Sequence, residues 1–391
     1  MSEQPPAPLP REKKVPVQVT RFDKVLGQRR NLIYIVVGAL VLVVLLALPP
    51  LGVSGFWLRT ITQAYVLAIM AIGWNFIGGY TGYAAFGNVA FFGLSAYVTG
   101  ILMKKVGVPF LPSLLTGALF AAAFAVLIGL AVLRLKGHYF AIATLGVAEA
   151  TREIIADDLG FLLKIPGDLL GLIGLDKAAE SLHAAAEKVA ITDGPRGIVL
   201  PFFQPPFQIG DLTKVQIEAW FFYYLTLSLV ILGILGTWWL IRTKLGYSLV
   251  AIREDEDSAK MLGINTTWAK VTAFALAAFM AGLAGGINAY WKTFVLPEEV
   301  FRIGHTLEMI LSTILGGPGT VLGPALGAGI FTLVSSLLIF KLKLGGFHVM
   351  ITGLFIVIVI VFTPKGVGEF LTGKKPLALS SLLENIRRYR V

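Results

Sequence analysis

The chain has 391 residues, of which 56% are apolar and only 14% are charged, and its mean hydropathy is +0.79. Soluble domains carry roughly 25% charged residues, so this composition argues against an ordinary soluble enzyme. The net charge of +10 would suit a nucleic-acid partner, but a membrane protein gathers the same excess in its cytoplasmic loops, and we expect no nucleic acid. The absence of cysteine excludes disulfides, thiolate metal sites and thiol nucleophiles.

Long apolar blocks recur along most of the chain. A helix that crosses a hydrocarbon core of about 30 Å needs roughly 20 mostly apolar residues. The blocks therefore predict an all-α integral membrane protein, a polytopic helical bundle of about ten transmembrane helices. The predicted spans are Leu32–Leu48, Phe56–Ile77, Phe86–Met103, Phe110–Leu133, Tyr139–Ala156, Trp220–Ile241, Val271–Tyr290, Thr306–Leu322, Ala325–Phe340 and Val349–Phe362.

Lysine and arginine are concentrated on one side of this predicted topology. With ten crossings and the N-terminus inside, the inside segments hold twenty of the 33 basic residues. Eight lie elsewhere in short loops and spans, and five lie in the long segment 157–215, to which the positive-inside rule does not apply. The distribution therefore predicts that both termini are cytoplasmic.

The remaining segments define the domain organisation. Thirty polar residues precede the first apolar run, which argues against a cleaved signal peptide. We expect a disordered, basic, proline-containing tail at the N-terminus and an extracytoplasmic insertion that forms a small folded cap with a short helix over Asp176–Val189. The predicted order is the tail 1–31, spans one to five in 32–156, the periplasmic insertion 157–215, span six in 216–241, a cytoplasmic loop 242–268, spans seven to ten in 269–363 and a cytoplasmic tail 364–391.

Glycine is frequent, with 43 residues, and part of it is regularly spaced. Gly282 and Gly286 are four residues apart, and so are Gly319, Gly323 and Gly327. Small residues let membrane helices approach closely, so both sets are predicted to be helix-packing positions.

The loop 242–268 contains a predicted cytoplasmic helix. Ser248 is a suitable N-cap and Gly263 a suitable C-terminal glycine, while Leu249, Ile252, Ala259 and Leu262 form one narrow apolar face. Four acids against two bases argue against a helix that lies on lipid, because such helices are typically rich in Lys and Arg. A protein partner is therefore the preferred interpretation.

At this segment the chain resembles LivM-type permeases, the membrane subunits of ABC importers for branched-chain amino acids. The resemblance rests on the run Gly246–Asn265 and on four further stretches in the same order. These are Gly79-Tyr80-Thr81-Gly82 through Phe91-Phe92-Gly93 to Tyr97, Leu133–Tyr139 through Ala141–Gly146, the turn Thr192–Ile198, and Leu315-Gly316-Gly317 through Gly319 to Leu322-Gly323-Pro324. Such permeases often have Ser in place of Ala85 and His or Gln in place of Asn88, and the insertion is longer here by Lys164–Ala190.

The resemblance implies a non-catalytic subunit in a bacterial inner membrane that works with a LivH-like permease, two ATP-binding subunits of the LivG and LivF type and a periplasmic substrate-binding protein. ATP and Mg²⁺ would be bound by the partners, and this chain would bind no cofactor. Independently, the sequence has no GxxxxGK[ST] phosphate-binding loop. The implied ATPase-coupling helix contains Arg253, Glu254, Asp255, Glu256, Asp257, Ala259, Lys260 and Gly263.

Ionisable residues inside the membrane are costly, at least about 2.5–3.5 kcal/mol each, and are candidate functional residues. Glu149 lies about 16 Å into span five, and Arg152 shares its helix face. The pair could line the translocation path or serve only to lock helices together, and the second reading is the simpler one. The candidates for the path are Asn88, Glu149, Arg152, Glu153 and Glu308. Four histidines without paired spacing predict no metal site.

Three alternatives remain open at this stage. Urea, short amides or another small polar metabolite could be the cargo of a related permease. A secondary transporter would need acidic residues deep in several spans, and only span five has them. A membrane enzyme would need a His/Asp/Glu/Ser constellation with usable spacing, which the sequence lacks.

Overall fold

The computed structural model describes residues 38, 40–157, 192, 194–203, 213–340 and 353. The predictions for the tails 1–31 and 364–391, for the helix Asp176–Val189 and most of the insertion, and for the span Val349–Phe362 lie outside these residues. The chain divides into two units, Met1–Val53 and Ser54–Val391. In the first, residues 40–47 are helical and expose apolar side chains such as Leu40 and Val43, and they overlap the predicted span Leu32–Leu48.

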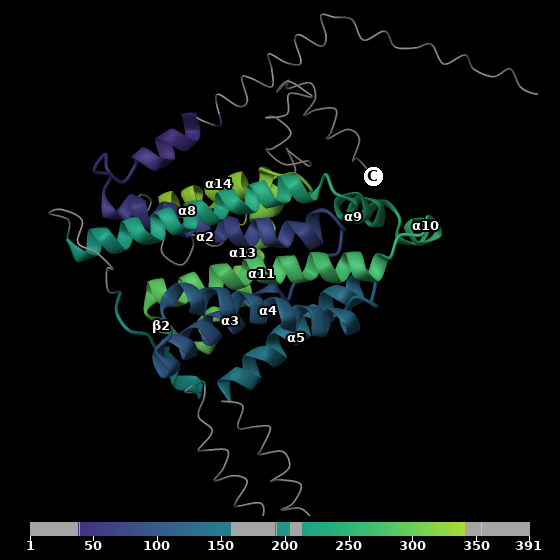
Figure 1. The fold of residues 1–391 in the computed structure, drawn as a ribbon, viewed down its shortest axis with the longest axis horizontal. Coiled ribbons are helices and arrows are strands. Elements are labelled where there is room, and N and C mark those ends of the chain that lie inside the picture. Colours follow the sequence, from purple (N-terminus) through teal and green to yellow (C-terminus); the bar gives the residue numbers. More distant parts are fainter. Residues whose placement is uncertain are drawn as a thin grey trace, which may run out of the picture. The chain divides into compact units, whose positions relative to one another are not determined.

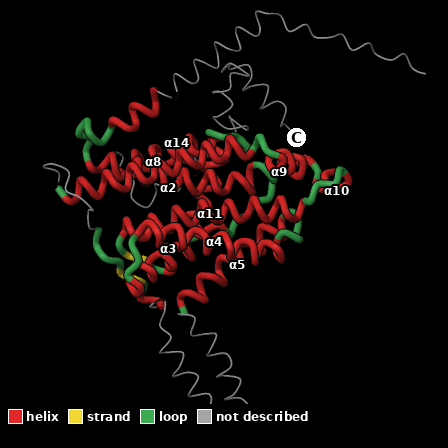
Figure 2. Tube along the Cα trace, in the orientation of Figure 1, coloured by secondary structure: helices red, strands yellow, loops and turns green. Residues whose placement is uncertain are grey.

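The described residues of the second unit form a bundle of helices with one very short sheet (Figures 1 and 2). Its elements are α2 (Gly55–Trp74), the π-helical turn η1 (Asn75–Gly79), α3 (Asn88–Ile101), the π-helical turn η2 (Leu102–Val106), α4 (Phe110–Val132), α5 (His138–Ala156), the 3₁₀ turn η3 (Gly194–Arg196), β1 (Ile198–Val199), α8 (Lys214–Leu240), α9 (Lys244–Glu254), α10 (Glu256–Met261), α11 (Thr266–Lys292), β2 (Phe294–Val295), α12 (Pro297–Val300), α13 (Ile303–Gly316) and α14 (Gly323–Phe340).

Within the described part, five helices are long and apolar enough to cross a membrane: Gly55–Gly79, Asn88–Val106, Phe110–Val132, Lys214–Leu240 and Thr266–Lys292. They correspond to the second, third, fourth, sixth and seventh predicted spans. The helix α5, which carries three charges in its second half, and the 14-residue α13 are not among them. The chain is therefore a helical membrane protein, and the count of ten crossings stays a prediction.

The core of the second unit lies around α2 and α11. Helix α11 packs against α3 and α4 on one side, and α2 packs against α8 and α14 (Figure 1). The outer helices α4 and α8 expose rows of apolar side chains, among them Leu119, Leu127, Leu232 and Trp239. Apolar surface of this kind is what a helix presents to lipid, so the exposure agrees with membrane insertion.

The glycines of α11 allow its close approach to α3 and α4. A Cβ at Gly282 would come within 2.9 Å of the Cα of Ala118, and one at Gly286 within 2.8 Å of Oγ1 of Thr99. Gly285 is tighter still, since a Cβ there would lie 2.0 Å from the carbonyl oxygen of Phe92. At Gly282 and Gly285 the atoms in the way belong to the backbone, so a side chain there would force the helices apart, whereas at Gly286 they are side-chain atoms of Leu114 and Thr99.

The second glycine set does not form one helical stripe. Gly319 lies in the loop between α13 and α14 with a φ of +76°, while Gly323 and Gly327 belong to α14 and lie against α13. The prediction of a single span over Thr306–Leu322 was too long, because α13 ends at Gly316 and the chain turns through Gly317 (φ +111°) and Pro318. The loop faces α9, as described below.

Contacts between connecting segments show which of them lie at the same end of the bundle. Lys136, before α5, pairs with Asp257 of α10, and Lys270 at the start of α11 reaches the carbonyl of Leu133. At the other end β1 pairs antiparallel with β2, with Ile198 opposite Val295 and Val199 opposite Phe294. The segments predicted as cytoplasmic therefore meet at one end, and a described part of the predicted external insertion meets the end of α11 at the other.

Candidate functional site

The predicted cytoplasmic helix is two helices joined at a break. Helix α9 begins after Thr243, whose Oγ1 accepts from the amide of Gly246, and α10 begins after Asp255, whose carboxylate accepts from the amide of Ser258 at 2.5 Å. Ser248 lies inside α9 and donates to the carbonyl of Lys244, so the prediction that it caps the helix was wrong. The extended backbone of Asp255 (φ −161°, ψ 115°) prevents a continuous helix.

The C-terminal end of α10 follows the sequence prediction. Gly263 has a φ of +82°, its amide donates to the carbonyl of Lys260, and the amide of Ile264 donates to the carbonyl of Ala259. This pair of bonds is a Schellman motif, which requires a left-handed residue that glycine supplies at little cost.

The apolar face of the segment is only partly buried. Leu249, Ile252 and Ala259 are at most 3% exposed, whereas Leu262 is 80% exposed and its neighbour Met261 89% exposed. The break at Asp255 shifts the helical phase, so Leu262 leaves the face that the sequence spacing predicted for it. The segment thus has a buried inner side and an apolar outer tip.

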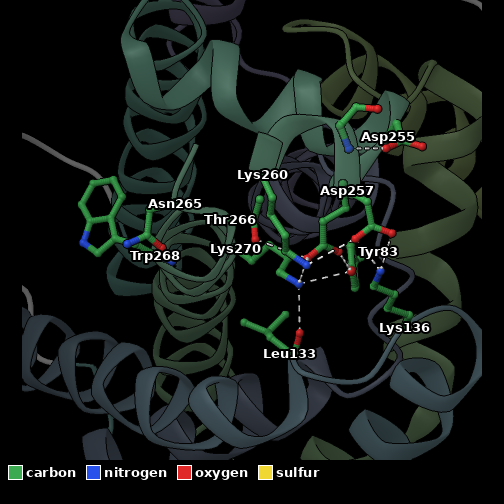
Figure 3. A network of polar contacts seen from close by, with 12 residues as sticks. Tyr83, Leu133, Lys136, Asp255, Asp257, Lys260, Asn265, Thr266, Trp268 and Lys270 are labelled. Carbon is green, nitrogen blue, oxygen red and sulfur yellow. Dashed lines mark hydrogen bonds and ion pairs between the residues drawn. The ribbon is translucent and has the colours of Figure 1, made fainter. Parts of the chain in front are cut away.

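Glu256 points into the bundle rather than outward. Its Oε1 lies 2.9 Å from Nζ of Lys270, and its Oε2 accepts a hydrogen bond from the hydroxyl of Tyr83. Figure 3 labels Lys270 and Tyr83 within this network. The side chains of Glu256 and Lys270 are 10% and 5% exposed. Lys270 also donates to the carbonyl of Leu133 at 3.0 Å and to the hydroxyl of Tyr83 at 3.2 Å.

Two further groups complete this network. Nζ of Lys260 lies 3.1 Å from Oε1 of Glu256, and Thr266 donates to the same oxygen at 3.3 Å. Burial of Glu256 favours its neutral form, but the hydrogen bonds from Tyr83, Lys270 and Lys260 outweigh it and lower its pKa to about 2. For Tyr83, burial and the bond to Glu256 both raise the pKa of the phenol. At neutral pH the pair is therefore a carboxylate and a neutral phenol.

The other charges of the segment have separate roles. Asp257 pairs with Lys136 at 3.0 Å on the exposed surface, and the hydrogen bond from that ammonium lowers its pKa. The backbone hydrogen bond of Ser258 lowers the pKa of Asp255, and Glu254 is exposed. Arg253 is exposed as a residue, but its Nη1 donates to the carbonyl of Gly79 at 3.0 Å.

The path candidates do not form one cluster. Arg152 on α5 contacts both Glu149 (Nη2 to Oε1 2.6 Å) and Glu153, and those two side chains are 56% and 60% exposed. Glu308 lies 3.6 Å from Arg302 and 3.7 Å from His305. Asn88 is fully buried at the start of α3, and neither atom of its amide has a hydrogen-bond partner in the part of the chain that the structure describes. Among the described residues there is no group of three or more metal-ligating side chains.

The sequence did not single out Tyr83 and Lys270, which hold the segment through Glu256, or Lys136, which adds an exposed ion pair. One signal could have found Lys270: it stands directly before the apolar run that starts at Val271, on a helix that crosses the membrane. A lysine at such a place needs a partner, and the nearest acids in the sequence are those of Glu254–Asp257.

Comparison with known proteins identifies the family. Residues 56–363 match the model of the family described as branched-chain amino acid transport system, permease component. The chain is 28% identical to the high-affinity branched-chain amino acid transport system permease protein LivM of Salmonella typhimurium and 29% identical to that of Escherichia coli K12, in each case over 79% of this chain and 68% of the relative. It is 29% identical to the autoinducer 2 import system permease protein LsrC of Salmonella paratyphi B, over 51% of this chain and 55% of the relative. No solved structure matches. The match covers most of the chain and includes the described helices from α3 to α14. The chain therefore belongs to the permease components of branched-chain amino acid transport systems.

Proposed function

We propose that the chain is the non-catalytic permease subunit of an ABC importer that carries branched-chain amino acids across a bacterial inner membrane. Ten spans with both termini in the cytoplasm are part of this proposal. The family match and the LivM relatives support it. Because the LivM matches cover 79% of the chain and the LsrC match 51%, branched-chain amino acids are the preferred cargo.

The partners in this proposal are a LivH-like permease, two ATP-binding subunits that hold ATP and Mg²⁺, and a periplasmic binding protein. The observation that carries the proposal is the two-sided segment α9–α10. Its inner side is held in the bundle through Glu256 and Arg253, while Met261 and Leu262 are 89% and 80% exposed at its tip. Exposed large apolar side chains at the water-facing end of a membrane protein favour a protein partner.

The translocation path is proposed to run along α5. This helix presents Glu149, Arg152 and Glu153 on an exposed face, together with Tyr139 and Ile142, which are 76% and 68% exposed. Charged groups along a helix that lies among membrane spans are costly in lipid, so this face would be covered by the partner permease or by the water of the path. Asn88 and Glu308 are further candidates for contact with the solute.

Copurification tests the proposal. The variant Met261→Asp with Leu262→Asp removes the apolar tip without touching the buried anchors, and it should lose the ATP-binding subunits while staying in the membrane. Lys136→Ala is the matched control, because it lies at the same end of the bundle and removes only an exposed ion pair. Full retention of the ATP-binding subunits by the double variant would contradict the proposed docking surface.

A further inference from the structure

The end of one membrane helix and the turn between two further helices meet beside the segment α9–α10. Helix α2 ends in the π-helical turn Asn75–Gly79, and α13 is separated from α14 by the loop 317–322. The side chain of Asn75, only 1% exposed, joins them: its amide nitrogen donates to the carbonyl of Thr320 at 2.9 Å, and its oxygen accepts from the amide of Gly319 at 2.8 Å. One buried side chain thus satisfies backbone groups that the loop leaves without helical partners.

Arg253, the next-to-last residue of α9, reaches the same place. Its Nη1 donates to the carbonyl of Gly79 at 3.0 Å, and a Cβ at Gly319 would lie only 2.6 Å from that nitrogen. The guanidinium group therefore lies between the end of the α2–η1 stretch and the turn after α13. We call Asn75, Gly79, Gly319 and Thr320 the joint.

The joint is tightly built around small residues. A Cβ at Gly79 would lie 1.8 Å from the side-chain oxygen of Asn75 and 2.6 Å from the amide nitrogen of Gly319. Gly319 has a positive φ of 76°, which glycine adopts without strain. Both glycines are thus required by contact or by conformation, and neither is explained by the packing of a regular helix.

The segment α9–α10 is therefore attached to the bundle at two different points. Glu256 ties α10 to Lys270 of α11 and, through it, to the end of α4. Arg253 ties α9 to the joint, which consists of residues of η1, directly after α2, and of the loop between α13 and α14. A displacement of the segment would act on these two groups of helices through separate contacts.

We propose that Arg253 is a positioning residue for transport: it transmits movement of α9–α10 to the joint and so sets the relative placement of the α2 end and the α13–α14 turn. This inference rests on the proposed function. The joint suits such a role because π-helical turns are frequent at functional sites, and hinges are a few residues at element ends that absorb changes of φ and ψ. Irregular backbone at the end of membrane helices is also tolerated where it is buried or borders a water-filled path.

The test uses the complete importer with its binding protein in liposomes and measures leucine transported per ATP hydrolysed. Arg253→Ala should lower this ratio severalfold, because movement of the segment would no longer reach the joint through the hydrogen bond to Gly79. Copurification of the ATP-binding subunits should not change. Arg253→Lys, which keeps a cationic donor, should restore at least half of the ratio. Arg242→Ala is the matched control, because Arg242 lies two residues before α9 and stacks on Trp238, 3.7 Å from the ring centre.

A fluorescent reporter separates transmission from a merely structural role. The chain has no cysteine, so Leu322→Cys, at a position 52% exposed in the same loop as Gly319 and Thr320, gives this chain a single thiol that can be labelled before the importer is assembled. Its signal should change on addition of ATP to the importer, and Arg253→Ala should abolish that change. If Arg253→Ala does not reach the membrane, Arg253→Gln, which is uncharged and shorter, should give the same loss.

A normal transport ratio in Arg253→Ala, equal to that of Arg242→Ala, would overturn the role of Arg253. An ATP response of the reporter that persists in Arg253→Ala would overturn it as well. Absence of ATP-dependent transport by the unaltered importer would instead contradict the proposed function, so the two failures are distinguishable.

Discussion

The carboxylate of Glu256 and the ammonium of Lys270 form a buried ion pair, 2.9 Å from Oε1 to Nζ, which ties the first turn of α10 to the first turns of α11. Breaking a buried pair from one side leaves an uncompensated charge and costs about 3–5 kcal/mol. Lys270→Met and Glu256→Gln should therefore each lower the thermal unfolding midpoint strongly. The double variant should be more stable than the sum of the two single effects implies.

The exposed ion pair Lys136–Asp257 supplies the control for the comparison of the single and double variants of Glu256 and Lys270. Its side chains are 55% and 66% exposed, and such pairs contribute at most about 1 kcal/mol. Lys136→Ala should leave the midpoint nearly unchanged. Additive effects of the two changes at Glu256 and Lys270 would show that these side chains do not interact in the folded protein.

Glu256 also predicts a dependence of stability on pH. Its pKa is lowered from the ordinary 4.5 to about 2 in the folded protein. A lowered pKa stabilises the folded state above the unfolded value, so this contribution is complete above about pH 4.5 and is lost as the pH falls toward 2. It amounts to roughly 3 kcal/mol as an upper estimate. Thermal unfolding of the purified protein between pH 7 and 3 should show the loss, and Glu256→Gln should have a flatter profile in this range.

Gly285 provides a test of the packing between α11 and α3. A Cβ there would lie 2.0 Å from the carbonyl oxygen of Phe92, so Gly285→Ala must push the helices apart and should destabilise the protein by about 1–3 kcal/mol. Gly236→Ala on α8 is the matched control, since nothing lies within 4 Å of its Cβ position. Equal unfolding midpoints for the two variants would mean that α11 and α3 are not in close contact.

Exchanging the charges of Glu149 and Arg152 on α5 tests whether they line the translocation path or only stabilise the fold. Arg152 Nη2 lies 2.6 Å from Glu149 Oε1, so Glu149→Arg with Arg152→Glu keeps the pair but changes the charge at each position. If the face lines the path, leucine uptake should fall while the amount of protein in the membrane stays normal. Preserved uptake would show that the pair is structural and would remove these residues from the path.

Much of the fold follows from the sequence because the signal is local. About 20 mostly apolar residues in a row predict a helix that crosses the membrane, and five of the described helices have this length and composition. Gly263 was also predictable, since a helix that ends in a left-handed residue commonly uses glycine there. The distribution of Lys and Arg placed residues 134–136 and the loop 242–268 on one side, and Lys136 indeed contacts Asp257.

The site itself was less accessible to sequence reasoning. The run Glu254–Asp257 has the composition of a solvated helix face, and only the break at Asp255 turns Glu256 toward Tyr83, 173 positions away. A buried asparagine such as Asn75 indicates an inter-helix hydrogen bond, but its partner was not predictable: Thr320 lies 245 residues away, and nothing in either segment alone indicates the pairing. The predicted span Thr306–Leu322 included most of the α13–α14 turn, whereas the structure ends α13 at Gly316, directly before Gly317 and Pro318.

The revised place of Glu256 changes how coupling should be tested. Asp255→Lys with Glu256→Lys would put a cation beside the buried Lys270 and remove the cap of α10, so loss of uptake in that variant would reflect damage to the fold. Substitutions at the exposed Met261 and Leu262 avoid both effects.

Reconstitution of the purified chain into liposomes tests the central claim most directly, namely that this subunit transports only when partner ATPases drive it. Leucine uptake should be absent with the chain alone under a proton or sodium gradient, and should start when the second permease, the ATP-binding subunits, the binding protein and ATP are supplied together. Accumulation of leucine by the chain alone on an ion gradient would contradict the account.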